Sequence, residues 1–190
     1  MDLSPVPFHV AALYRFCRLD ANEALKASLA AFCAGHGIKG TLLVAAEGIN
    51  GTVAGSADAV AALVAHLEAM PGMAGLDVKY SHAAEMPFHR MKVRLKREIV
   101  TMGVEGIDPT LSVGTYVEPA DWNALISDPD TVVIDTRNAY EVSLGSFRGA
   151  VDPATESFRQ FPDWVERHRG ALAGRKVAMF CTGGIRCEKA

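Results

Sequence analysis

The sequence predicts an α/β protein built from two domains. The first half alternates strand-like and helix-like runs, and the second half contains two short apolar runs, 131–135 and 176–180, separated by helical patterns. At about 150 residues per domain, a chain of 190 residues has room for two small domains. Apolar residues make up 49% of the chain and charged residues 22%, which excludes disordered, collagen-like and coiled-coil proteins.

In the first domain, residues 1–100, the patterns predict the element order βαββαβ, followed by one more strand. The first four strands are expected over 9–17, 38–46, 52–54 and 76–81, and the two helices over 21–34 and 57–70. Asp20 and Ser56 are the expected N-caps, and Asn50-Gly51 is the expected hairpin turn before the third strand. This order is that of the ferredoxin-like fold, so we expect an α+β N-terminal domain.

The additional strand, predicted over residues 89–100, carries a line of positive charge. Side chains on one face of a strand repeat about every 6.6 Å. The cations expected on one face are Arg90, Lys92, Arg94 and Lys96, and the apolar residues on the other are Met91, Val93 and Leu95. Together with Arg97, these cations are a candidate RNA-binding surface, because their spacing is close to that of phosphates along a nucleic-acid strand. A charged edge strand that prevents aggregation is the alternative.

Residues 101–115 lack periodicity and contain several glycines, so they are predicted to link to a second domain over 116–190. Its expected helices cover 118–126, 140–144 and 157–168, and its expected buried parallel strands cover 131–135 and 176–180. Sites in parallel sheets lie at the carboxyl ends of strands. Asp135 ends the first strand and Cys181 follows the second, so both are candidate site residues.

Cys181 is the candidate catalytic residue of this second domain. It opens the loop Cys181-Thr182-Gly183-Gly184-Ile185-Arg186, in which the glycines let the backbone curl so that its N–H groups point inward. Those donors, together with the charge of Arg186, should lower the pKa of the Cys181 thiol and make it reactive near neutral pH. A purely structural cysteine at a strand end is the alternative.

The remaining candidates are less specific. Cys187 could act as a resolving thiol for an oxidised or persulfidated Cys181. Asp135 and Arg137 could orient the loop or the substrate, or they could form an ion pair that only braces the sheet. Cys17 and Cys33 are expected to be buried small hydrophobic residues. No Cys or His spacing typical of zinc is present, so no metal is expected, and no flavin or iron motif indicates another cofactor.

Several motifs resemble a known family. The residues that resemble a rhodanese-like domain are Asp135-x-Arg137, Tyr140-Glu141, Gly145-x-Phe147-x-Gly149-Ala150 and the loop from Cys181 to Arg186. The resemblance narrows to the rhodanese-containing tRNA uridine hydroxylases through three segments, 47–52, 86–94 and 180–190. The last segment is the most specific, because ordinary rhodaneses rarely continue the loop as Arg-Cys-Glu-Lys.

The resemblance implies an enzyme that converts the wobble uridine of tRNA (position 34) to 5-hydroxyuridine, with molecular oxygen as co-substrate and Cys181 as the essential cysteine. Alternatives are a thiosulfate-type sulfurtransferase or persulfide carrier, and a non-enzymatic rhodanese-like binding module. A phosphatase is less favoured, because the related phosphatases use a loop one residue longer.

Hydropathy and the chain ends give two further expectations. No apolar run approaches the about 18 residues of a membrane span, and Met1–Pro5 lacks the layout of a signal peptide, so a cytoplasmic protein is expected. The helix predicted after Arg186 has barely begun at Ala190, so the second domain is expected to be C-terminally incomplete.

Overall fold

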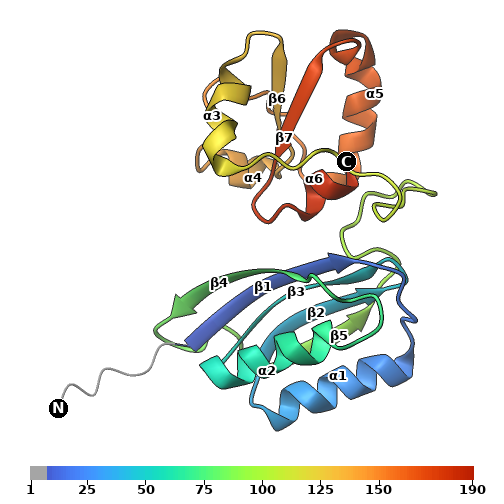
Figure 1. Ribbon diagram of the computed structural model, residues 1–190, viewed down its shortest axis with the longest axis vertical. Helices are drawn as coiled ribbons and strands as arrows, with labels where there is room; N and C mark the ends of the chain where they lie inside the picture. The colour runs from blue at the N-terminus through green and yellow to red at the C-terminus, as the bar shows by residue number, and fades with distance from the viewer. Residues whose placement is uncertain (1–7) are drawn as a thin grey trace, which may run out of the picture. The chain divides into compact units, whose positions relative to one another are not determined.

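The computed structural model describes residues 8–190, which divide into two compact units, one that ends at Ile99 and one that covers Val100–Ala190 (Figure 1). Each unit is described by itself. The expectation drawn from Met1–Pro5 lies outside the described residues. No helix in the described part of the chain is long and apolar enough to cross a membrane.

The first unit has the predicted βαββαβ order, followed by one more strand. Its elements are β1 (Phe8–Phe16), α1 (Glu23–Gly35), β2 (Lys39–Ala45), β3 (Gly48–Gly55), α2 (Ala57–Glu68), β4 (Asp77–Ala83) and β5 (Met91–Leu95). The sheet order is β4-β1-β3-β2-β5, and only the β2–β5 pair is parallel. Both helices cover the same face of the sheet (Figure 1). The ferredoxin-like prediction is therefore confirmed.

The N-cap of α1 differs from the prediction. Asn22, not Asp20, caps this helix, and its side-chain oxygen accepts a hydrogen bond from the Leu25 N–H at 2.9 Å. Asp20 instead accepts a hydrogen bond from the Asn22 amide at 3.1 Å. The cap of α2 is as predicted, because the Ser56 hydroxyl accepts from the Ala59 N–H at 3.2 Å.

The prediction that Asn50-Gly51 forms the hairpin turn is wrong. Both residues lie inside β3, which begins at Gly48. Gly48 has φ +137°, and a Cβ there would collide with the Arg15 carbonyl oxygen, so Gly48 is the glycine that the turn requires. The Asn50 side chain donates to the Ile99 carbonyl at 2.8 Å and therefore links β3 to the segment that follows β5.

β5 is shorter than the strand predicted over 89–100. The Glu47 carboxylate accepts a hydrogen bond from the Ile99 N–H at 2.6 Å. Together with the bond from Asn50, this contact holds Ile99 against the β2–β3 turn, and Ile99 is 1% exposed. β5 therefore ends at Leu95, and beyond it the chain is held by hydrogen bonds between Ile99 and the side chains of Glu47 and Asn50.

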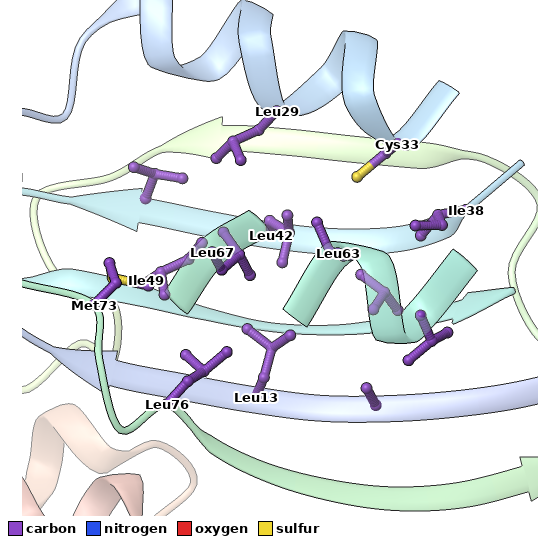
Figure 2. Close-up of a cluster of buried hydrophobic side chains, with 14 of the residues drawn as sticks. Leu13, Leu29, Cys33, Ile38, Leu42, Ile49, Leu63, Leu67, Met73 and Leu76 are labelled. Carbon is purple, nitrogen blue, oxygen red and sulfur yellow. The ribbon is translucent and has the colours of Figure 1, made fainter. Parts of the chain in front are cut away.

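The core of the first unit lies between its sheet and its two helices. Figure 2 shows Leu13 and Ile49 from the strands facing Leu29 on α1 and Leu63 on α2. Burying each such side chain contributes about 1.5–3 kcal/mol. The core also includes Cys33, whose pKa burial raises to about 11, and Cys17, so both predicted buried cysteines are confirmed.

The second unit contains a parallel two-stranded sheet. Its elements are α3 (Pro119–Ser127), β6 (Thr131–Asp135), α4 (Ala139–Val142), the 3-10 helix η1 (Phe158–Gln160), α5 (Phe161–Leu172), β7 (Lys176–Phe180) and α6 (Ile185–Lys189). β6 and β7 match the predicted strands residue for residue and pair in parallel, with Asp135 beside Phe180.

The second unit has its own hydrophobic core. Ile134 of β6 packs in one cluster with Phe161 and Trp164 of α5. Met102 is buried in the same cluster and Val100 packs against it. Val100, which was predicted to end the first domain, and Met102, at the start of the predicted linker, therefore belong to the core of the second unit.

Candidate active site

The topology of the second unit places Cys181 and Asp135 at the same edge of its sheet. Because β6 and β7 are parallel neighbours in register, both carboxyl ends lie at the same edge of the sheet. Cys181 follows β7 directly and opens the loop that leads into α6. The Thr136 hydroxyl donates to the Phe180 carbonyl at 3.0 Å and fastens the end of β6 to that of β7.

Backbone N–H groups surround the Cys181 sulfur. The Gly184 N–H donates to the Cys181 Sγ at 3.0 Å, and the N–H groups of Arg186 and Cys187 also hydrogen-bond to it. Gly184 adopts φ +89°, a left-handed conformation that favours glycine. The loop therefore presents several donors to one anionic atom, as its glycines predict.

These contacts lower the pKa of the Cys181 thiol to about 5. The largest cause is a hydrogen bond from the Cys187 thiol; burial opposes it, and the N–H groups and the charge of Arg186 add to it. The same hydrogen bond, together with burial, raises the pKa of Cys187. Cys187 also lies 3.3 Å from the Thr136 hydroxyl. The contacts of the pair therefore favour the proton on Cys187 and the thiolate on Cys181.

Glu141 holds the other side of the loop. It accepts from Arg186 at 2.6 and 2.8 Å and from the Thr182 hydroxyl at 2.5 Å. These donors hold the pKa of Glu141 at about 2, with the Arg186 hydrogen bonds as the largest cause. Sequence reasoning placed Glu141 only within a motif and assigned it no role. The sequence signal that could have drawn attention to Glu141 is the capping box Asn138-x-x-Glu141, which starts α4.

Asp135 and Arg137 form a forked ion pair. Asp135 is fully buried and accepts from the Arg137 Nε at 2.9 Å and Nη2 at 2.7 Å. The Ser146 hydroxyl also donates to Asp135, at 2.8 Å, and Arg137 donates to the Gly145 carbonyl at 2.6 Å. The pair therefore ties the 144–147 loop to the end of β6.

Two cavities adjoin Cys181. One, of about 290 Å³, runs beside β7 and includes Trp122 and Cys187 in its lining. The other, of about 530 Å³, is lined by Arg137, Leu144, Phe147 and other residues of the two loops. Within residues 8–190, no group of three or more His, Cys, Asp or Glu side chains is arranged to hold a metal ion.

The predicted cationic surface belongs to the first unit. Lys92 and Arg94 alternate on the edge strand β5 with Met91, Val93 and Leu95, which pack against the core, so the predicted alternation is confirmed. The cations Arg90, Arg94, Lys96 and Arg97 are exposed, and Lys92 is partly exposed. Because β5 is an edge strand, the protective alternative also fits its position.

The fold and the site together describe a class: an acylphosphatase-like domain followed by a unit with a cysteine of lowered pKa at a strand end. Residues 8–99 match the family model described as the UPF0176 acylphosphatase-like domain. The whole chain is similar to curated proteins named tRNA uridine(34) hydroxylase.

The relative from Mesorhizobium japonicum is 76% identical over 97% of this chain and 60% of its own length. The relative from Brucella ovis is 66% identical over 99% of this chain and 62% of its own length. The chain thus spans about three fifths of the relatives it matches. Among solved structures, an acylphosphatase from Coxiella burnetii matches half of this chain and all of its own, with 12% identity and a TM-score of 0.35.

Proposed function

We propose that this chain takes part in hydroxylating the wobble uridine of tRNA to 5-hydroxyuridine, with molecular oxygen as co-substrate. The observation that carries the proposal is 76% identity, over 97% of the chain, to a protein named tRNA uridine(34) hydroxylase. The second unit is proposed to be rhodanese-like, since its loop surrounds a cysteine sulfur with backbone N–H groups. A tRNA substrate makes the cytoplasm the proposed location.

Cys181 is the proposed reacting group. Its low pKa makes it an anionic sulfur nucleophile at neutral pH, and Cys187 supplies the hydrogen bond that favours this state. Thr182, Gly183, Gly184, Ile185 and Arg186 form the proposed active-site loop. Arg186 contributes positive charge and, through Glu141, fixes the loop.

The proposed tRNA-binding residues are Arg90, Lys92, Arg94, Lys96 and Arg97. Four of these five side chains are exposed and Lys92 is partly exposed, so their charges are available to phosphates. Such contacts give affinity without reading the base sequence. Selection of the uridine would then depend on the second unit.

The test is nucleoside analysis of tRNA from cells that lack the protein, complemented with the wild-type chain or with Cys181→Ser. We expect 5-hydroxyuridine with the wild type and at least a hundredfold less with Cys181→Ser, because the hydroxyl is not ionised at neutral pH. Cys33→Ala, at a buried thiol in the other unit, is the matched control and should restore the nucleoside. Normal 5-hydroxyuridine with Cys181→Ser would refute the role of Cys181.

A second candidate function is sulfur transfer, favoured by the same cradle of N–H groups, which would also hold a terminal persulfide sulfur. Turnover of thiosulfate and cyanide by the purified chain, with no change in tRNA nucleosides, would support it. A non-enzymatic module would be supported instead if Cys181 failed to react with iodoacetamide.

A further inference from the structure

The cavity lined by Arg137 contains a hydrogen-bond donor that the protein itself does not use. Arg137 Nε and Nη2 bind Asp135, and Nη2 also binds the Gly145 carbonyl. Nη1 has no partner among residues 8–190. The Arg137 side chain is 17% exposed, so part of it remains open to the cavity that it lines.

The orientation of this guanidinium is fixed before any ligand arrives. Asp135 holds one edge through two hydrogen bonds, and the group lies over the Phe180 ring, 5.5 Å from its centroid. A planar guanidinium held in this way presents its remaining N–H groups without losing side-chain entropy on binding. The Nη1 of Arg137 is therefore held ready to donate to an acceptor in the cavity.

Arg186, the other arginine beside Cys181, is not available in the same way. Its Nη1 and Nη2 both donate to Glu141, and its guanidinium also hydrogen-bonds to Cys181. The donors of Arg186 therefore bind Glu141 and Cys181, whereas Nη1 of Arg137 is left to bind a ligand.

The rest of the cavity offers apolar contact. Phe147 is 42% exposed and Leu144 is 87% exposed, although both are large apolar side chains that gain from burial. The cavity volume of about 530 Å³ lies within the range of small-molecule sites. Cys181 lines the same cavity, so a ligand held there would lie beside the reactive sulfur.

We propose that this cavity receives the uracil ring of the target nucleotide, with Arg137 Nη1 donating to a ring carbonyl oxygen and with Phe147 and Leu144 contacting the ring. The proposal rests on the proposed tRNA function. Enzymes that act on a base take it out of the stack into a pocket, where hydrogen bonds and apolar contacts hold it. In this role Arg137 is a substrate-binding residue.

The first experiment compares the wild-type chain with Arg137→Lys in forming 5-hydroxyuridine on tRNA in vitro. Lysine keeps the charge but loses the planar fork, so we expect kcat/KM to fall about tenfold to a hundredfold, the usual effect of one charge-assisted hydrogen bond. Arg148→Gln, at an exposed arginine in the same segment, is the matched control and should change kcat/KM less than twofold. An unchanged alkylation rate at Cys181 would show that the loop is intact.

A second experiment changes the substrate atom instead of the protein. Transfer RNA carrying 2-thiouridine or 4-thiouridine at position 34 replaces one carbonyl oxygen with sulfur, a weaker acceptor. In the wild type, one of the two thio-tRNAs should lose at least tenfold in kcat/KM, and with Arg137→Lys this penalty should largely disappear. The assignment would be overturned if the loss of kcat/KM with the thio-tRNA were equal in both proteins. It would also be overturned if neither thio-tRNA lowered kcat/KM in the wild type.

The outcomes separate this inference from the proposed function. If the wild type forms 5-hydroxyuridine and the kcat/KM of Arg137→Lys equals that of Arg148→Gln, only the assignment of the cavity to the uracil ring fails. Arg137→Lys could instead lower kcat/KM equally for all substrates, with an effect that shrinks as salt rises. That result would indicate that Arg137 binds a phosphate, and it would also overturn the assignment to the uracil ring. If the wild type, with Cys181 reactive, forms no 5-hydroxyuridine on any tRNA, the proposed function itself fails.

Discussion

At the scale of single residues, the site depends on where one proton resides. Cys181 and Cys187 share a hydrogen bond, and the backbone N–H groups of Gly184, Arg186 and Cys187 also bond to the Cys181 sulfur. Arg186 adds charge beside the same atom. Each of these contacts favours the anion on Cys181, whereas Cys187 has only the Thr136 hydroxyl and the Arg186 charge to offset its burial. The two cysteines therefore have different chemical roles.

This difference predicts a pH profile. Alkylation of Cys181 by iodoacetamide should rise with a midpoint near pH 5, far below the about 8.5 of a free cysteine. Cys187→Ala should move the midpoint upward, because it removes the largest stabilising contact. Peptide mass spectrometry at each pH would identify the alkylated residue. A wild-type midpoint near 8.5 would contradict the arrangement.

The same pKa shift affects stability. Between about pH 5 and pH 8.5 the folded state binds fewer protons at Cys181 than the unfolded state does. The contribution of the thiolate to stability therefore rises with pH through this window, and it disappears as pH falls through about 5.

Some of the site residues were visible in the sequence and others were not. The loop from Cys181 to Arg186 was predictable, because a buried strand followed by glycines and an arginine indicates an anion cradle. The role of Glu141 was not, because it depends on α4 lying beside a loop about forty residues later in the chain. The unused Nη1 of Arg137 was not predictable either, because the sequence indicates an ion pair with Asp135 but not which nitrogens form it.

At the scale of elements, the strength of local signals decided what could be predicted. β6 and β7 were predicted to the residue because both are short apolar runs with clear ends. The Asn50-Gly51 turn failed because a strong local preference was overridden by two close backbone approaches, at Gly48 and at Gly51. β5 was predicted too long because its end is set by the contacts of Ile99 with Glu47 and Asn50.

The edge strand β5 carries the prediction that belongs to this scale. Arg90→Glu combined with Arg94→Glu should weaken tRNA binding at least tenfold at low salt, because two attractive interactions with phosphates become repulsive. The dependence of log Kd on log salt should also become shallower, by roughly 1 for each phosphate that is no longer neutralised. Filter binding or fluorescence anisotropy across a salt series would measure both effects.

A matched control for β5 is Arg148→Glu combined with Arg167→Glu, two exposed cations of the second unit that undergo the same change of charge. This control should reduce binding much less. Equal reductions in the two double variants would show that net charge, not the β5 surface, governs binding and would leave β5 as a protected edge.

At the scale of the whole molecule, the described residues form two hydrophobic clusters, one in each unit. Leu63 is buried in the first cluster and Ile134 in the second. Both tryptophans, Trp122 and Trp164, lie in the second unit, so tryptophan fluorescence reports on that unit alone. Far-ultraviolet circular dichroism reports on the helices of both units.

These two signals should respond differently to core variants. Leu63→Ala should cost about 2–5 kcal/mol and lower the unfolding midpoint seen by circular dichroism, while the fluorescence midpoint and the alkylation rate of Cys181 stay unchanged. Ile134→Ala should lower the fluorescence midpoint, because its cavity opens beside Phe161 and Trp164. Urea unfolding followed by both signals would test this. If Leu63→Ala moved both midpoints equally, the two cores would unfold as one cooperative system, and the reactivity of Cys181 would then depend on the stability of the first unit as well as on its own loop.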